Sequence, residues 1–239
     1  MTRFQTLFGI KESQVKKTCL VMPLLRKDTL VRFGVKNFLR GRLYRSGNSP
    51  SFTLIHTGVG APLLGDAVLY LYRTQCKNII LFGSCGSTGD KDDVKIGSLV
   101  TPQASYALES FSGMLLKDYK TWEAFNADKN LLEKFLVSNK DRDIKKVTCA
   151  TLGSLKLEDD YTGVLNEKGI QIVDMECSSF FSASKYIKRR AMALFYVTDI
   201  INKKPFYKGL NPKEQLTLDS SIKSATNMLC EFIKKNLND

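Results

Sequence analysis

One acidic residue, Asp199, stands in apolar surroundings that would draw a carboxyl group out of water. It follows the run from Met192 to Val197, with only Thr198 between, and precedes Ile200 and Ile201. Burial of this kind raises the pKa of a carboxyl group, which makes the group usable as a general acid near neutral pH. A helix cap or a buried hydrogen-bond acceptor would look the same, and the sequence alone favours neither interpretation.

A second acidic segment, Asp174-Met175-Glu176, lies between an apolar run and a helical pattern. A carboxylate can accept hydrogen bonds from two neighbouring hydroxyls of a sugar, and a methionine can pack against the sugar's apolar face. Acids in this position can also serve only to complement the dipole at the start of a helix. The segment is therefore a candidate sugar site or a helix start.

Two glycine-containing segments, Thr57–Pro62 and Gly83–Ser87, follow apolar runs that resemble strands. Each combines glycines with a small hydroxyl residue, so its backbone N–H groups can approach an anion closely. Either segment alone is more simply interpreted as an ordinary turn between a strand and a helix, because isolated glycine patterns are frequent.

The elements that must position these residues alternate along the chain. Several apolar runs lack a polar alternation, which is typical of central strands covered on both faces. The strands predicted in this way are Thr18–Met22, Phe52–His56, Asn78–Phe82, Ser98–Thr101, Val147–Thr151, Ile170–Val173 and Ala191–Val197. Helical spacing predicts helices over Leu63–Gln75, Asn130–Ser138, Ser178–Tyr186 and Pro212–Lys235. We therefore predict an α/β fold in which a mixed central β-sheet is flanked by helices, with residues 1–239 forming a single domain.

Taken together and in this order, the four features resemble the nucleoside phosphorylase and nucleosidase family, which includes purine nucleoside phosphorylase, uridine phosphorylase and methylthioadenosine nucleosidase. The resemblance covers about residues 18–233, and Gly83–Gly86 and Asp174–Glu176 are its most specific parts. It implies cleavage of an N-glycosidic bond, with a purine as the favoured base. No cofactor and no metal are implied, and phosphate would be the co-substrate.

The resemblance also implies roles for individual residues. Asp199 would protonate or hydrogen-bond the leaving base. Contacts to the ribose and base would come from Asp174, Met175, Glu176 and Ser84. Phosphate would be held by Arg26, which lies in a segment similar to the family's Gly-Asp-Pro-x-Arg loop, together with Ser84 and Gly58. A homo-oligomer, dimeric or hexameric, is expected on the same ground.

Some positions depart from the family pattern. Leu81 stands where the hexameric phosphorylases carry an arginine, and no arginine occurs near Lys213–Gln215, where the family usually has one. Phosphorolysis is still favoured, since one arginine and a cradle of N–H groups can bind a dianion. The alternatives are a nucleosidase that uses water and a non-catalytic nucleoside-binding protein of the same fold.

Composition excludes several other classes of protein. The net charge is +12, but the basic residues are scattered and lack interleaved aromatic residues, so we expect no nucleic-acid partner. The longest apolar run, Ala191–Val197, is far below the roughly 20 residues of a membrane-spanning helix. Six cysteines without a C-x-x-C motif indicate reduced thiols in a cytoplasmic protein, and a single histidine disfavours a histidine-rich metal site.

Overall fold

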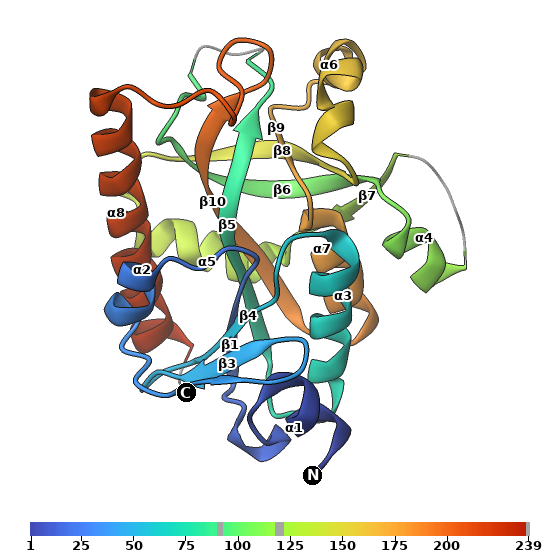
Figure 1. Ribbon diagram of the computed structural model, residues 1–239, viewed down its shortest axis with the longest axis vertical. Helices are drawn as coiled ribbons and strands as arrows, with labels where there is room; N and C mark the ends of the chain where they lie inside the picture. Colours follow the sequence, from blue (N-terminus) through green and yellow to red (C-terminus); the bar gives the residue numbers. More distant parts are fainter. Residues whose placement is uncertain (90–92, 118–121, 238–239) are drawn as a thin grey trace.

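A computed structural model describes residues 1–89, 93–117 and 122–237. In these residues ten strands form one mixed sheet, and helices cover both of its faces (Figure 1). The strands are β1 (Thr18–Met22), β2 (Phe38–Arg40), β3 (Arg45–Asn48), β4 (Thr53–His56), β5 (Asn78–Ser87), β6 (Leu99–Leu108), β7 (Glu123–Asn126), β8 (Ile144–Leu152), β9 (Ile172–Asp174) and β10 (Arg190–Ile200). The α-helices are α1 (Arg3–Phe8), α2 (Lys27–Arg32), α3 (Ala61–Tyr70), α4 (Phe111–Leu116), α5 (Lys129–Ser138), α6 (Glu158–Glu167), α7 (Cys177–Tyr186) and α8 (Pro212–Asn236).

The sheet closes on itself at one end. Strand β10 pairs in parallel with β5 and antiparallel with β6, and β6, β8 and β9 lead back to β5. The other end is open and continues from β5 through β1, β4 and β3 to the edge strand β2. Figure 1 shows β5 and β10 running side by side through the centre of the molecule, where the two parts meet. The prediction of an α/β fold with a mixed central sheet is confirmed.

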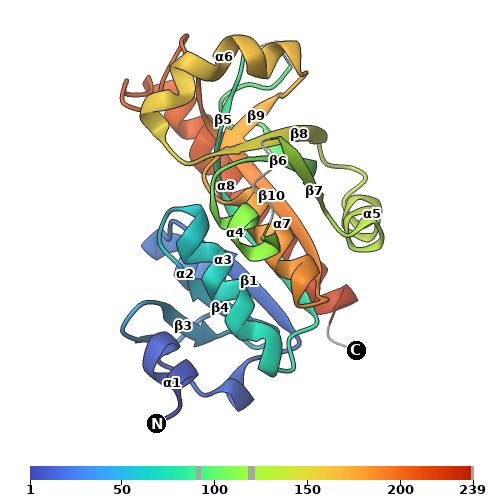
Figure 2. The same ribbon diagram turned by 90° about the vertical axis from the view of Figure 1, so that its right-hand side faces the viewer.

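The central strands bury alternate residues against different helices. In β5 and β10 the odd-numbered residues, such as Ile79 and Ala193, pack into the core made with α3 and α7. The even-numbered residues, such as Ile80 and Leu194, pack into the core made with α5 and α8. Figure 2 shows α7 and α8 on opposite sides of β10. Both faces of the sheet are therefore excluded from water here, which explains why the sequences of these strands are continuous apolar runs.

Two of the predicted boundaries are wrong in a way that concerns the site. The segment Gly83–Ser87, predicted to be a turn, continues strand β5. Likewise Thr198 and Asp199, predicted to follow a strand, lie within β10, next to a β-bulge between Val197 and Asp199. Pairing with β10 holds Gly83–Ser87 extended, and Gly86 and Ser87 pair with β9 as well. A bulge re-aims the side chains beside it, which turns Asp199 out of the regular pattern of the strand.

Helix α8 begins at a capping box. The side chain of Asn211 accepts from the N–H of Glu214, and the Glu214 carboxylate accepts from the N–H of Asn211. Pro212 occupies the first turn, where its missing N–H costs nothing. Glu214 also forms an ion pair with Lys204. These contacts tie the segment 201–211, which runs from β10 to α8, to the first turn of α8.

Candidate active site

The acidic residues singled out in the sequence line one cleft, whose wall includes Gly86. In the sheet Gly86 is paired with Asp199 of β10 on one side and with Val173 of β9 on the other. A Cβ atom on residue 86 would lie 3.1 Å from Asp199 Oδ2 and 3.4 Å from Val173 Cγ2, so the absence of a side chain permits this approach. A cleft of about 510 Å³ opens here, and both Asp199 and Glu176 line it.

Asp199 is almost fully buried, with 7% of its surface exposed. Thr198 Oγ1 donates to its Oδ1 at 2.7 Å, which fixes the orientation of the carboxyl group. Burial raises the pKa of Asp199, while the hydrogen bond from Thr198 acts in the opposite direction. A buried, oriented carboxyl group with a raised pKa has the properties of a general acid.

Glu176 lies at the meeting point of two helix N-termini. It is the N-cap residue of α7, and its Oε1 accepts from the N–H of Gly60, the N-cap residue of α3, at 2.6 Å. Gly60 has φ +116°, a conformation that L side chains rarely adopt, so glycine suits this position. Burial and the charge of Asp174 raise the pKa of Glu176, and its backbone hydrogen bonds lower it. The carboxylate is held firmly at the cleft wall.

Asp174 lines the cleft, but protein donors engage both of its oxygens. Oδ2 accepts from the N–H groups of Glu176 and Cys177, and Oδ1 accepts from Thr151 Oγ1 at 2.7 Å. Burial raises the pKa of Asp174 and these hydrogen bonds lower it. The contacts make Asp174 a positioning residue for the turn that carries Glu176. The expectation that it also touches substrate stays a prediction.

The cleft brings together most of the other predicted site residues. Met175 and Ser84 line it, from the turn before α7 and from β5 respectively. Gly58 does not line it, although its neighbour Val59 does. Arg26 is also outside the lining. Pro23 and Leu24, which shortly precede Arg26 in the chain, belong to the lining.

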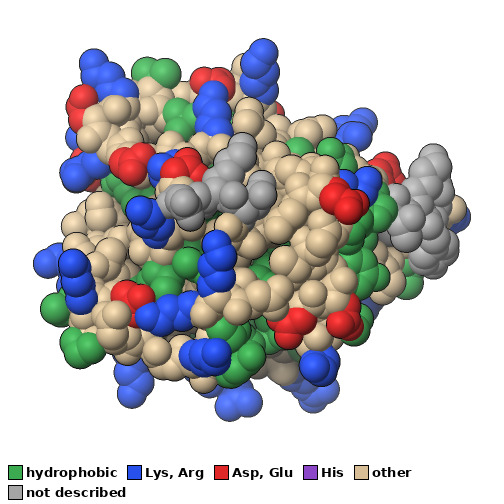
Figure 3. All heavy atoms as spheres, turned by 90° about the horizontal axis from the view of Figure 1, so that it is seen from above, with side chains coloured by type: hydrophobic (Ala, Val, Ile, Leu, Met, Phe, Trp, Pro, Cys, Tyr) green, Lys and Arg blue, Asp and Glu red, His purple; other side chains and the backbone are tan. Residues whose placement is uncertain are grey.

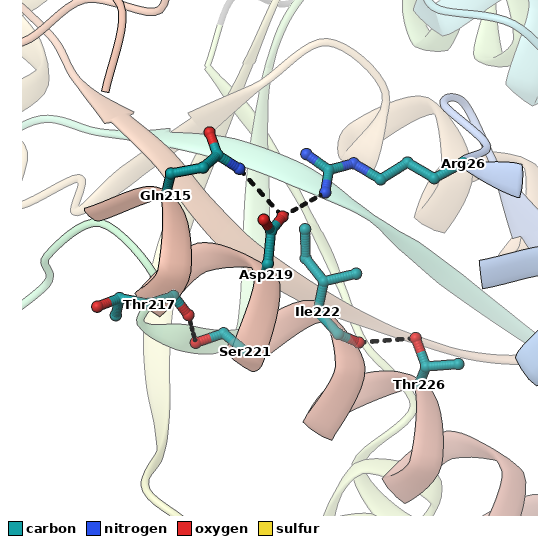
Figure 4. Close-up of polar contacts among 7 residues, drawn as sticks. All are labelled: Arg26, Gln215, Thr217, Asp219, Ser221, Ile222 and Thr226. Atoms are coloured by element: carbon teal, nitrogen blue, oxygen red, sulfur yellow. Dashed lines mark hydrogen bonds and ion pairs between the residues drawn. The ribbon is translucent and has the colours of Figure 1, made fainter. Parts of the chain in front are cut away.

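Arg26 is instead held on the surface beside the cleft. Its Nη1 donates to Asp219 Oδ1 at 2.7 Å, and Gln215 Nε2 donates to the same oxygen at 3.0 Å (Figure 4). Both partners of the ion pair are nearly half exposed, and an exposed pair of this kind contributes only about 0.2–1 kcal/mol. Gln215 itself lines the cleft, so this cluster sits at its rim.

Glu158 and Lys208 line the cleft without having been predicted as site residues. Glu158 begins α6, and burial together with the charges of Asp199, Asp159 and Asp174 raises its pKa to about 7. In the sequence it stands beside Asp159 and Asp160, and a run of three acids is typical of a solvent-exposed segment, so no local signal marked it. Lys208 lies in the 201–211 segment and had no signal beyond its position after a strand.

The model of the phosphorylase superfamily matches residues 21–234 of this chain. The chain belongs to the phosphorylase superfamily. A purine nucleoside phosphorylase of DeoD type from Hahella chejuensis is 24% identical over 198 residues, covering 80% of this chain and 77% of that protein. The prediction of an enzyme of the phosphorylase type is confirmed at the level of the superfamily.

Solved structures of uridine phosphorylase from Vibrio fischeri share the fold of this superfamily member. One covers 95% of each chain with 20% identity and a TM-score of 0.79. Another, in complex with 6-hydroxy-1-naphthoic acid, covers 98% of this chain and 100% of its own, with 21% identity and a TM-score of 0.80. At this level of identity the likeness concerns the fold alone.

One face of this phosphorylase superfamily member carries dispersed basic residues. On the face seen from above, lysines and arginines alternate with acidic and uncharged side chains (Figure 3). None of the helices in the described ranges is long and apolar enough to cross a membrane. In the same ranges, no three histidine, cysteine, aspartate or glutamate side chains are grouped so as to hold a metal ion.

Proposed function

We propose that the chain is a nucleoside phosphorylase that cleaves the N-glycosidic bond of a purine nucleoside with phosphate, giving free base and ribose 1-phosphate. The observation that carries the proposal is the meeting of Asp199 and Glu176 in one cleft. The transition state of this reaction places positive charge on the sugar and negative charge on the base. A carboxylate fixed on the sugar hydroxyls and an acid at the base stabilise these charges, respectively.

In this proposal Glu176 holds the ribose 2′- and 3′-hydroxyls, Met175 packs on the sugar, and Asp199 donates a proton or hydrogen bond to the base. Ser84 contributes its hydroxyl to phosphate, with Lys208 as the only cation among the described residues that line the cleft. Four acids also line the cleft, and burial raises the pKa of each. A raised pKa favours the neutral form of a carboxyl group, which reduces the negative charge that a phosphate dianion would meet.

The phosphate dependence of base release tests this proposal. The purified protein is incubated with adenosine, inosine, guanosine and uridine, with and without added phosphate, and the sugar product is identified. We expect base release only with phosphate, together with ribose 1-phosphate. If base is released at the same rate without phosphate and free ribose is formed, the protein is a nucleosidase. No base from any nucleoside would mean a binding protein of this fold.

Arg26 is expected to move from Asp219 to phosphate. A hydrogen bond to a charged group contributes roughly 1.5–3 kcal/mol, more than the exposed ion pair that Arg26 would leave. Arg26→Ala should therefore raise the KM for phosphate about 10- to 100-fold, since each 1.4 kcal/mol is a factor of about ten. The KM for nucleoside should change little, as steady-state kinetics with each substrate varied in turn would show.

Two matched variants control this test. Lys27→Ala removes the same charge one residue away and should leave the KM for phosphate unchanged. Asp219→Asn releases Arg26 from its partner and should lower that KM by up to about 5-fold, the equivalent of about 1 kcal/mol. An unchanged KM for phosphate in Arg26→Ala would remove Arg26 from the phosphate site.

The remaining features of the proposal concern the whole molecule. One sheet runs through the described residues, which supports residues 1–239 as a single nucleoside phosphorylase-like domain.

Four exposed apolar side chains at the cleft support a homo-oligomer: Leu24, Val59, Leu155 and Phe206. Sedimentation velocity measures the size of this oligomer. A cytoplasmic location and a role in purine salvage stay predictions, which cell fractionation and metabolite analysis of a deletion strain would test.

A further inference from the structure

Glu158 is a buried acid that the chemistry described above does not use. Its side chain lines the cleft and the residue is 9% exposed. Within the described residues, no hydrogen bond or ion pair of its carboxyl group is present, in contrast to Asp174, Glu176 and Asp199. The carboxyl group lines the cleft without a protein partner, so a ligand bound there can supply a hydrogen-bond donor to it.

A purely structural role explains Glu158 less well. It is the first residue of α6, and an acid there complements the helix dipole. Asp159 and Asp160 follow it in the same turn and do the same from exposed positions. The dipole therefore gives no reason to bury a third acid among other acids.

The surrounding charges show which part of a ligand Glu158 would meet. Asp199 and Asp174, from β10 and β9, act on its carboxyl group, as does Asp159 of its own helix. Glu176 and Lys208 are the other charged residues of the described cleft lining. Burial is the largest cause that raises the pKa of Glu158 to about 7, and the charge of Asp199 is the second largest. Glu158 thus lines the same cleft as Asp199, the group proposed to act on the base, and is influenced by its charge.

The edge of a purine that meets Asp199 distinguishes two classes of base. In a 6-aminopurine, N7 accepts a hydrogen bond and the neighbouring 6-amino group donates one. In a 6-oxopurine, both N7 and O6 accept. An acid at N7 with a carboxylate beside it matches the first class and repels the second. A site built to pair a donor discriminates strongly against an analogue without it.

We propose that Glu158 recognises the exocyclic amino group of the base, so that the cleft prefers 6-aminopurines over 6-oxopurines when this carboxyl group is ionised. The inference rests on the proposed function for the location of the base beside Asp199. Below neutral pH the protonated carboxyl group can donate to O6, and the preference weakens. Glu158 is then a specificity-determining residue.

Equilibrium binding of the free bases tests the inference without turnover. Adenine and hypoxanthine are titrated into the full chain by calorimetry at pH 6 and pH 8. At pH 8 we expect adenine to bind at least about 10-fold more tightly, the low end for one charge-assisted hydrogen bond. At pH 6 the ratio should fall below about 3. In Glu158→Gln, whose amide both donates and accepts, it should stay below about 3 at both pH values.

Asp160→Asn is the matched control, because it removes an exposed charge from the same turn of α6. It should keep the wild-type ratio and its pH dependence. An equal ratio in the wild type and Glu158→Gln would overturn the inference, and so would a wild-type ratio that does not change with pH. The second criterion needs no variant, so the inference stays testable if Glu158→Gln fails to fold.

The two proposals fail differently. If no nucleoside releases base but adenine binds with the expected pH-dependent preference, the proposed function is wrong and the role of Glu158 stands. If base is released with phosphate but the preference is absent, the role of Glu158 is wrong and the proposed function stands.

Discussion

Asp199→Asn is expected to lower the turnover number at least about 100-fold, the low end for a positioned proton donor, while the fold is retained. Asparagine has the same shape, and its amide oxygen can keep the 2.7 Å hydrogen bond from Thr198. It cannot transfer a proton to the base. Steady-state turnover at saturating nucleoside and phosphate measures the loss, and thermal melting followed by circular dichroism checks the fold.

The pH dependence of turnover separates proton donation from a structural role. If the protonated form of Asp199 is active, turnover in the wild type should fall as pH rises through its pKa. The hydrogen bond from Thr198 lowers that pKa, so Thr198→Val should move the fall to higher pH. Asp199→Asn should lack this transition in its residual activity. Near-normal turnover in Asp199→Asn would remove Asp199 from the chemistry.

Much of the fold could be predicted because the central strands are apolar on both faces. The bounds of β1, Thr18–Met22, are as predicted, and α7 differs by one residue at its start. The strands β2 and β3, at the open end of the sheet, were not predicted. Their sequences, Phe38–Arg40 and Arg45–Asn48, are short and rich in arginine, serine, glycine and asparagine, residues that carry little strand signal.

The site could be predicted only where local sequence decides the chemistry. Asp199 and Glu176 follow apolar runs, and that signal located both. Their meeting in one cleft depends on pairing between β5, β9 and β10, which are far apart in the chain. Glu158 carried no helical signal, because α6 begins with three acids and contains Gly163. The pairing of Arg26 with Asp219 joins residues 193 positions apart and could not be inferred locally.

Glu176→Gln is expected to reduce kcat/KM for ribonucleosides about 100-fold or more. Two hydrogen bonds from ribose hydroxyls to a carboxylate contribute roughly 1.5–3 kcal/mol each, and a neutral amide forms weaker ones. A 2′,3′-dideoxynucleoside never makes these bonds, so its kcat/KM should fall by less than about 5-fold, well under one of those bonds. The ratio of the two losses, measured with the same base on both sugars, identifies the sugar contact.

The control for this variant is Glu109→Gln. The Glu109 carboxylate accepts from Ser178 Oγ of the same helix α7 at 2.8 Å, but it does not line the cleft. Its loss should lower thermal stability and leave the ratio between ribonucleosides and dideoxynucleosides unchanged. If Glu176→Gln lowers kcat/KM equally for ribonucleosides and dideoxynucleosides, the Glu176 carboxylate acts by joining the N-terminus of α7 to Gly60 at the N-terminus of α3. The ribose must then be held by other groups.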